Sequence, residues 1–310
     1  MSVAPPSGEQ FELRHGEQRA TVVEVGGGLR SYSVAGREVL ESYPLEAICD
    51  GGHGTPLIPW PNRLADGRYS FNGKEHQLAL SEPTRHNAIH GLLRWRSWRA
   101  LEQTPAAVTV GIQLHPMPGY PFSLDIRIVY ELGEEGLKVT TTASNVGEEP
   151  CPYGCGQHPY LSPGEGPIDR CTLELPAAVR ILTDEERSLP SGREAVAGTA
   201  FDFRSPRVIG ALGIDSAFTE LVRDSRGRVP VRLACPDGRT VELWTGEGYE
   251  LIEIFTGDTL APGRRRTALA VEPMSCPPNA FASGEQLVVL DPGGRHTARW
   301  GVRLLSPRPS

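Results

Sequence analysis

Residues 124–141, LDIRIVYELGEEGLKVTT, alternate apolar and polar side chains on both sides of a turn at Gly133–Gly136. A period of two residues is the pattern of a β-strand with one buried and one exposed face. Residues 108–114 show the same alternation just before this stretch. The pattern therefore predicts neighbouring antiparallel strands joined by short turns.

Two turn dipeptides repeat this arrangement elsewhere in the chain. Asn72-Gly73 and Asp237-Gly238 each separate two strand-like runs, and such dipeptides favour the tight turns of β-hairpins. No segment has the periodicity of a long amphipathic helix, and only Arg207–Leu212 is expected to form a helical turn. Many short strands with frequent turns predict an all-β fold, a large antiparallel β-sandwich.

Length and charge narrow the class of protein. The chain has 310 residues and a formal net charge of −7, with acidic and basic residues interspersed. Nucleic-acid binding needs a clustered basic face, and a membrane-spanning helix needs about 18 or more apolar residues in a row. Neither is present, so we expect no nucleic-acid or membrane partner, and either a monomer or a homodimer. We expect a single domain over residues 1–310, with flexible ends at about 1–10 and 307–310.

The cysteines do not form a recognisable framework. The N-terminus has no apolar core of a signal peptide, so we expect a cytoplasmic protein with six reduced thiols. Cys151, Cys155 and His158 lie close together in sequence, but their spacing is wider than that of a zinc motif. No second Cys/His pair lies at a matching distance. We therefore expect neither a metal nor another cofactor.

Residues 264–281, RRRTALAVEPMSCPPNAF, present the leading candidate for a functional group. An apolar strand at Thr267–Val271 delivers Glu272 to a turn that is rich in proline. A carboxylate held in this way is aimed at a site rather than solvated. The run Arg264–Arg266 fits a solvated loop, with contact to an anionic group of a substrate as the alternative.

Two loop histidines are candidates to face Glu272. His158 precedes a proline, which restricts its backbone to extended geometry. His90 precedes a glycine, whereas His86 in the same segment lies in a polar run and is expected to be exposed. Taken alone, each histidine also fits an ordinary surface or packing role.

Four further residues have side chains that suit a sugar. Asn62 and Arg63, in the rigid loop PWPNR, offer hydrogen bonds of the kind that hydroxyl groups accept and donate. Asp215 precedes a strand, and Trp95 offers an aromatic face for stacking, although turn and core roles are commoner for these types. Together with Glu272 and the histidines, this set can bind a polyol and move protons at two oxygens.

In their order and spacing, six motifs resemble the aldose 1-epimerases, or galactose mutarotases, over nearly the whole chain. They are PWPNRLADGRYSFNG (59–73), HNAIHGLLRWRSW (86–98), GQHPYL (156–161), DSAF (215–218), FTGD (255–258) and VEPMSCPPNAF (271–281). The resemblance implies a β-sandwich of the galactose mutarotase type with an open cleft on one sheet. It also implies interconversion of the α and β anomers of a free aldose, without a cofactor.

The resemblance assigns roles to individual residues. Glu272 corresponds to the catalytic base and His158 to the acid, while Asn62, Arg63, His90 and Asp215 fall on positions that hold the sugar. Two differences from the galactose-specific members are the stretch around His158 and Glu253, where glutamine is commoner. These features resemble a bacterial branch of broad aldose and sulfoquinovose mutarotases.

Three other functions stay open at this point. An inverting glycoside hydrolase would use Asp215 and Glu272 about 6.5–9.5 Å apart, with a water between them. A hexose-6-phosphate or sulfosugar epimerase would need an anion clamp, for which Arg94, Arg96 and Arg264–Arg266 are the candidates. A non-catalytic carbohydrate-binding protein on the same fold is the third, because fold does not fix function.

Overall fold

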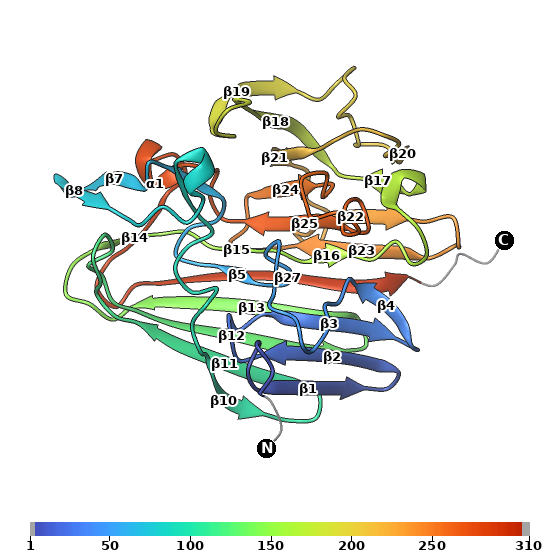
Figure 1. Ribbon diagram of the computed structural model, residues 1–310, viewed down its shortest axis with the longest axis horizontal. Coiled ribbons are helices and arrows are strands. Elements are labelled where there is room, and N and C mark those ends of the chain that lie inside the picture. Colours follow the sequence, from blue (N-terminus) through green and yellow to red (C-terminus); the bar gives the residue numbers. More distant parts are fainter. Residues whose placement is uncertain (1–3, 306–310) are drawn as a thin grey trace.

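Two large antiparallel β-sheets dominate the computed structural model, which describes residues 4–305 (Figure 1). Within these residues, twelve strands form sheet 1 and nine form sheet 2. Sheet 1 contains β1 (Gln10–His15), β2 (Gln18–Val23), β3 (Leu29–Val34), β4 (Arg37–Leu40), β5 (Pro56–Leu57), β15 (Gly156–Gln157), β16 (Tyr160–Leu161), β18 (Ala177–Thr183), β19 (Pro190–Ala195), β21 (Asp215–Leu221), β24 (Leu251–Phe255) and β25 (Leu269–Met274). Sheet 2 contains β10 (Arg99–Gln103), β11 (Ala107–Leu114), β12 (Leu124–Gly133), β13 (Gly136–Asn145), β17 (Thr172–Glu174), β20 (Arg207–Val208), β22 (Val229–Ala234), β23 (Thr240–Thr245) and β27 (Arg295–Leu305).

Three small strand pairs and three short helices complete the described part of the chain. The pairs are β6 (Arg63–Ala65) with β9 (Asn87–Ile89), β7 (Arg68–Phe71) with β8 (Lys74–Gln77), and β14 (Cys151–Tyr153) with β26 (Val288–Leu290). The helices are the 3-10 turns η1 (Pro83–Arg85) and η2 (Ile168–Arg170) and the single α-helical turn α1 (Ala280–Ser283). Among residues 4–305, no helix has the length and apolar character that crossing a membrane requires.

The predicted all-β fold and its hairpins are confirmed. β12 and β13 pair from Leu124↔Asn145 to Gly133↔Gly136, so the turn lies where the alternation predicts it. Asn72-Gly73 joins β7 to β8, and Asp237-Gly238 lies between β22 and β23. The helical turn expected at 207–212 is wrong, because Arg207 and Val208 instead pair with β17 as strand β20.

Apolar side chains from the facing sides of the sheets form one large core. Leu13 and Val22 of sheet 1 share this cluster with Ile126, Val139 and Trp300 of sheet 2, and all five are buried. The alternation that predicts the strands also supplies this inner face, since every second side chain points into the core.

The N-terminal segment is tied to the sandwich. The carbonyl oxygens of Ser7 and Glu9 accept hydrogen bonds from the amides of Val25 and Glu24, at 3.0 and 2.9 Å. Backbone groups in residues 7–10 thus have partners within the fold, and flexibility over residues 1–10 stays a prediction. Residues 1–3 and 306–310 lie outside the described part of the chain, and so does the expected flexible end at 307–310.

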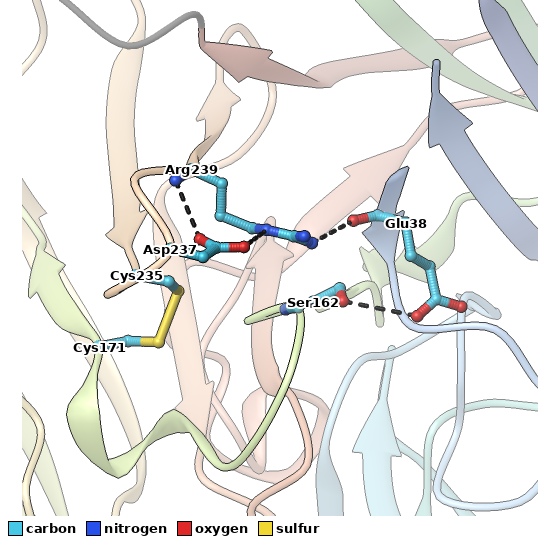
Figure 2. Close-up of a disulfide and its surroundings, with 7 residues drawn as sticks. Glu38, Ser162, Cys171, Cys235, Asp237 and Arg239 are labelled. Carbon is cyan, nitrogen blue, oxygen red and sulfur yellow. Dashed lines mark hydrogen bonds and ion pairs between the residues drawn. A yellow bond between two sulfur atoms is a disulfide. The ribbon is translucent and has the colours of Figure 1, made fainter. Parts of the chain in front are cut away.

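A disulfide bond between Cys171 and Cys235 corrects the expectation of six reduced thiols (Figure 2). Thr172 pairs with Ala234 in the β17–β22 ladder, so the next residues outward lie opposite one another, with Cα atoms 4.4 Å apart. This separation matches that of closely spaced antiparallel neighbours. Strand register thus brings together two cysteines that are 64 residues apart in sequence. The other four cysteines are free thiols.

Candidate active site

Strand register sets Glu272 between His158 and Glu253. Gly156 pairs with Met274 and Tyr160 with Ala270, which places His158 level with Glu272. On the other side of β25, Glu253 of β24 pairs directly with Glu272. Side chains at paired positions project from the same face of a sheet. The result is a row of titratable groups, His158–Glu272–Glu253, on one face of sheet 1.

The neighbouring row contributes Phe255 and Asp215 to the lining of a cleft. Tyr160, Ala270, Phe255 and Asp215 are successive cross-strand neighbours, two residues along from the catalytic candidates. The cleft has a volume of about 290 Å³, near the lower end of the range for small-molecule sites. Its lining includes Asn62, Arg63, His90, Arg94, His158, Asp215 and Glu272.

His158 is held by packing rather than by hydrogen bonds to its ring. Its Nε2 lies 3.3 Å from Glu272 Oε1, while its buried Nδ1 has no hydrogen-bond partner among the described residues. The ring stacks on Tyr160, with centroids 5.0 Å apart and planes 13° apart. Tyr160 is itself anchored, because its hydroxyl donates to the carbonyl oxygen of Gly51 at 2.7 Å.

Gly52 makes room for the His158 ring. Its φ of +74° suits glycine, and a Cβ atom there would lie 2.7 Å from His158 Cδ2. The Gly51-Gly52 segment therefore serves the site in two ways, as an acceptor for Tyr160 and as a close wall for the His158 ring.

Burial favours the neutral form of each member of the His158–Glu272 pair. It lowers the pKa of His158 to about 3, with further lowering by the positive charges of His53 and Arg94. It raises the pKa of Glu272 well above its usual range, as does the charge of Asp215, while Arg63 acts in the opposite direction. Both shifts act in the direction that keeps the proton of the pair on Glu272 rather than on His158.

His90 presents a hydrogen-bond donor to the cleft. Its Nδ1 accepts a hydrogen bond from the backbone amide of Asn62 at 3.2 Å, so the proton of the neutral ring belongs to Nε2. Burial lowers the pKa of His90 well below its usual range, and nearby positive groups such as Arg94 add to this. The imidazole is therefore neutral at physiological pH.

This tautomer argues against a metal ion at the site. Ligand atoms of His90, His158 and Glu272 lie within 4.8 Å of one another, an arrangement compatible with a cation. A metal needs the lone pair of a ring nitrogen, however, and the hydrogen bond from Asn62 already occupies that of His90 Nδ1. The remaining nitrogen, Nε2, carries the proton. The donor set therefore fits a substrate oxygen better than a metal.

Asn62 and Arg63 lie together on the rim of the cleft. Asn62 has a φ of +54°, and its Oδ1 accepts a hydrogen bond from the amide of Arg63 at 2.8 Å. Glu82 holds the guanidinium of Arg63 through two contacts, at 2.9 and 3.2 Å. Asp215 Oδ2 lies 3.8 Å from the same guanidinium. Arg63 is thus fixed by one carboxylate and faces another across the cleft.

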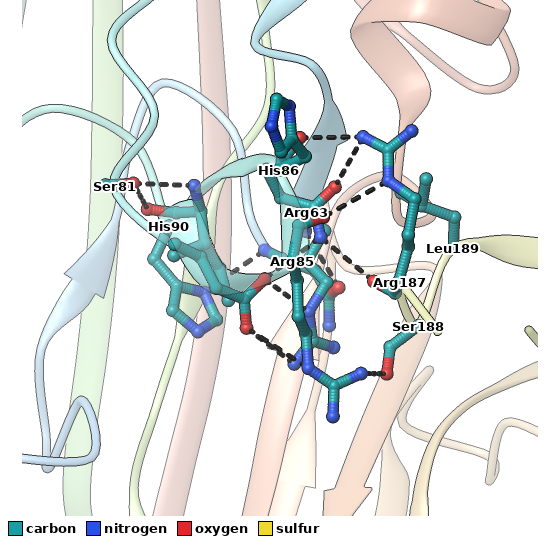
Figure 3. A network of polar contacts seen from close by, with 12 residues as sticks. Arg63, Ser81, Arg85, His86, His90, Arg187, Ser188 and Leu189 are labelled. Atoms are coloured by element: carbon teal, nitrogen blue, oxygen red, sulfur yellow. Dashed lines mark hydrogen bonds and ion pairs between the residues drawn. The ribbon is translucent and has the colours of Figure 1, made fainter. Parts of the chain in front are cut away.

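A second layer of contacts supports Glu82, and Figure 3 labels Arg63, Arg85, His86 and Arg187 within this network. Asn87, which is fully buried, donates from Nδ2 to Glu82 Oε2 at 3.0 Å and to the carbonyl oxygen of Arg187 at 2.9 Å. Arg187 comes from the turn between β18 and β19 and donates to the carbonyl oxygens of Arg85 and His86, at 3.1 and 2.7 Å. The turn of one hairpin thereby braces the loop that carries the partner of Arg63.

Arg94, the neighbour of the predicted stacking residue Trp95, lines the cleft. Trp95 is 58% exposed and lies outside the residues that form the lining. The Arg94 guanidinium contacts the carbonyl oxygen of Ile89 at 3.4 Å, and no carboxylate of the described residues lies within ion-pair distance of it. Burial lowers its pKa from the ordinary value.

The arginine run before Glu272 is used within the fold. Arg264 pairs with Glu41 and Asp50, at 3.2 and 3.3 Å. Arg266 pairs with Asp169 and Asp258, at 3.1 and 2.9 Å. These contacts leave Arg94 as the cleft-lining member of the proposed anion clamp. His86, as expected, is exposed and lies outside the cleft lining.

Sequence reasoning did not single out Glu82 or Tyr160 as parts of the site. Glu82 precedes a proline, the same feature that pointed to His158, and this signal was available. Tyr160 lies two residues after His158 and so shares its face of the sheet, which a strand assignment through this segment would have revealed.

Comparisons with known proteins all point to the same protein family. A sequence profile of the family described as aldose 1-epimerase matches residues 9–303. The chain is 36% identical over 298 residues to YihR of Escherichia coli K12, a protein described as uncharacterized, covering 94% of this chain and 91% of YihR. It is 27% identical over 286 residues to galactose mutarotase of Mus musculus, covering 82% of this chain and 80% of that one.

A solved structure shares the fold. The GalM/aldose epimerase homologue from C. elegans aligns with a TM-score of 0.85 and 18% identity, covering 97% of this chain and 99% of that chain. At this level of identity, the likeness concerns the fold alone.

Proposed function

The chain belongs to the aldose 1-epimerase family, and we propose that it interconverts the α and β anomers of a free aldose. The observation that carries the proposal is the buried contact of 3.3 Å between His158 and Glu272 in a cleft lined by hydrogen-bonding groups. Anomerisation needs one group to take the proton of the C1 hydroxyl and another to protonate the ring oxygen. The two groups of this pair suit these tasks.

The shared proton of the pair balances the reaction. With the proton on His158, the carboxylate of Glu272 accepts the C1 hydroxyl proton while the imidazolium protonates the ring oxygen and opens the hemiacetal. The pair is then in the form that burial favours, with Glu272 protonated and His158 neutral. After rotation about the C1–C2 bond, the reverse transfers close the ring on the other face of the aldehyde.

The remaining residues of the cleft have binding roles in this proposal. Nε2–H of His90 donates to a sugar oxygen, and Arg63 and Asn62 anchor hydroxyl groups. Asp215, on the opposite wall, accepts from a hydroxyl. The reaction proceeds slowly in water and is nearly thermoneutral, so the site needs to position the ring more than to supply an extreme acid or base.

A second candidate, an aldose with an anionic group at C6, is favoured by Arg94. The guanidinium lines the cleft and has no carboxylate partner among residues 4–305; its contacts are the Ile89 carbonyl oxygen and the Trp95 ring, 5.9 Å from its centroid, so it is available to a substrate anion. Phosphate and sulfonate groups share this chemistry. A neutral sugar would leave the cation to water.

An anomer-exchange panel tests both candidates. NMR exchange or polarimetry on glucose, galactose, a 6-phosphate aldose and a 6-sulfonate aldose should show accelerated mutarotation of at least one free sugar. If Arg94 selects the substrate, an anionic sugar should exceed glucose in kcat/KM by about tenfold or more, the scale of one charge-assisted contact. Sugar binding without any acceleration would overturn the enzymatic proposal, and release of a reducing sugar from a glycoside would favour a hydrolase.

A further inference from the structure

His53 is a buried histidine that the proposed reaction does not use. It is 2% exposed, and its ring packs face to face with that of Tyr160, with centroids 3.8 Å apart and planes 4° apart. The residues that line the cleft do not include His53, so it does not meet the sugar directly. Any effect of His53 on the reaction must therefore pass through a neighbouring residue.

Both ring nitrogens of His53 have polar partners. Nδ1 lies 3.0 Å from the carbonyl oxygen of Asp50, and since a carbonyl oxygen only accepts, Nδ1 is the donor. Nε2 lies 2.5 Å from Glu41 Oε2 and 2.8 Å from Arg264 Nη2. Arg264 Nη2 also donates to Glu41 Oε2 at 3.2 Å, so the three side chains form a closed cluster. The ring of His53 is thus held at two of its edges.

This cluster draws on three segments of the chain. Glu41 directly follows β4, and its amide donates to the carbonyl oxygen of Tyr160 at 2.9 Å, which places it beside Tyr160 in the sheet. His53 lies in the glycine-rich loop between β4 and β5, and Arg264 belongs to the arginine run that precedes β25. Three segments thus converge on one ring, which suits a rigid support within the fold.

His158, in contrast, depends on packing for its orientation. Its buried Nδ1 has no hydrogen-bond partner among residues 4–305. Its ring stacks on Tyr160 with the two planes 13° apart, so the rings of His53, Tyr160 and His158 are all nearly parallel. In a closely packed interior, a ring in such a stack cannot tilt unless its neighbour moves too.

We propose that His53 is a positioning residue that sets the ring plane of His158 through Tyr160. The polar partners of His53 hold the first ring, and the stack passes this orientation on. Nε2 of His158 thereby stays 3.3 Å from Glu272 Oε1. Proton transfer depends on such alignment, so a tilted His158 ring should slow the chemical step. The catalytic consequence rests on the mutarotase function, whereas the effect on the His158 ring does not.

Replacing His53 should lower kcat more than it changes KM. His53→Ala removes the ring behind Tyr160 and leaves the residues of the cleft lining in place, so we expect kcat to fall by about tenfold and KM to change by less than about twofold. Anomer-exchange NMR on the aldose that wild type converts fastest measures both quantities. His76→Ala is the matched control, because His76 also stacks on a tyrosine, Tyr69, but lies outside the cleft lining. A loss through KM alone, or an equal loss of kcat in the control, would overturn the role.

Glu41 gives a second route to the same ring if His53→Ala fails to fold. Glu41→Ala releases Nε2 of His53 but keeps the stack, so we expect kcat to fall by about threefold. Glu41→Gln keeps a polar partner and should lose less. The effects of Glu41→Ala and His53→Ala should be non-additive in a double-mutant cycle, because both act on one ring. Additive effects, or equal losses in the two Glu41 variants, would contradict the proposal.

NMR of ring-labelled histidine observes His158 itself, independently of catalysis. The ring current of Tyr160 should place the ring protons of His158 upfield of those of an unstacked histidine, and His158→Asn assigns their signal. His53→Ala should move this signal toward the unstacked position, and His76→Ala should leave it unchanged. An unmoved signal in His53→Ala would overturn the positioning role even if mutarotase activity is confirmed. A moved signal in a protein without mutarotase activity would support the role and count against the proposed function.

Discussion

Glu242 in sheet 2 and Glu272 in sheet 1 both sit at the centre of a row of three paired residues, and both are nearly inaccessible to solvent. The row through Glu242 runs Arg232–Glu242–Arg303. Its carboxylate oxygens accept from the two guanidinium groups at 2.8 and 2.9 Å. The row through Glu272 runs His158–Glu272–Glu253, and Glu272 Oε2 has no partner among the described residues. The same sheet geometry therefore produces two different electrostatic environments.

The difference teaches what converts a buried carboxylate from a structural group into a reactive one. A buried charge is stable when cations complete its hydrogen bonds, and Glu242 has two. Glu272 has a histidine on one side and another acid on the other, so no cation completes its hydrogen bonds, and burial raises its pKa. Because His158 Nε2 lies 3.3 Å from Glu272 Oε1, a proton can move between the two side chains. The unpaired row suits proton exchange, and the paired row suits stability.

Replacing Glu272 should give the largest effect. Glu272→Gln removes the proton acceptor while keeping the shape, so we expect the mutarotation rate to fall by about 10²–10⁴-fold with sugar binding largely retained. Polarimetry on fresh α-D-glucose or α-D-galactose, combined with calorimetric binding, measures both quantities. Retention of most of the activity would remove Glu272 from its assigned role.

The pH profile of His158→Asn sharpens the same prediction. In wild type, the high-pH limb reports loss of the proton that the pair shares. Without the histidine that limb should disappear. Because burial raises the pKa of Glu272, residual base catalysis should instead increase with pH as the carboxyl group ionises. An unchanged profile would transfer the acid role to His90, and His86→Asn serves as the exposed-histidine control.

The sequence predicts the members of the row His158–Glu272–Glu253 better than it predicts their arrangement. Alternation and turn dipeptides are local, so the hairpins around Gly133–Gly136 and Asn72-Gly73 are predictable. The pairing of Glu272 with His158 depends on a register between segments more than 100 residues apart. The local sequence offered His158 and His90 alike as candidates to face Glu272, and the resemblance to a family assigned the acid role to His158. Glu253, within LIEIF, has the alternation of an ordinary strand. Its unusual character comes from neighbours on two other strands.

The same reasoning explains two errors. Cys171 and Cys235 have nothing in their local sequence to indicate pairing, and only the β17–β22 register brings them together. Arg207–Leu212 has local features of a turn, yet Arg207 and Val208 pair at a sheet edge. Tertiary pairing overrides local preference in both places.

Replacing Glu242 should give an effect of intermediate size, on stability rather than on activity. Glu242→Gln leaves Arg232 and Arg303 without their shared carboxylate, but both side chains are about one-third exposed and regain water. We therefore expect a loss of about 1–2 kcal/mol in the free energy of unfolding, measured by urea denaturation, with kcat and KM unchanged. A large loss of activity at wild-type stability would show that the two rows are not functionally distinct.

The smallest effect should come from Arg187, which joins a fully paired network to the rim of the reactive cleft (Figure 3). Its guanidinium donates to Asn87 Oδ1 at 3.3 Å, and Asn87 in turn donates to Glu82, which holds Arg63, so Arg187→Ala should loosen Arg63 without touching the sugar. We expect KM to rise by about threefold with little change in kcat, the sign of weakened uniform binding. Steady-state mutarotation kinetics measure the split.

A matched control and a coupling test distinguish this from general loosening of the hairpin. Arg193 lies on the adjoining strand β19 and pairs with Glu285 outside the network, so Arg193→Ala should leave KM unchanged. If Arg187 acts through Glu82, the effects of Arg187→Ala and Glu82→Gln should be non-additive in a double-mutant cycle. Additive effects, or an equal rise in KM for Arg193→Ala, would contradict the connection. A confirmed connection would mean that the paired carboxylate Glu82 serves the cleft by holding a cation still, while unpaired Glu272 serves it by exchanging a proton.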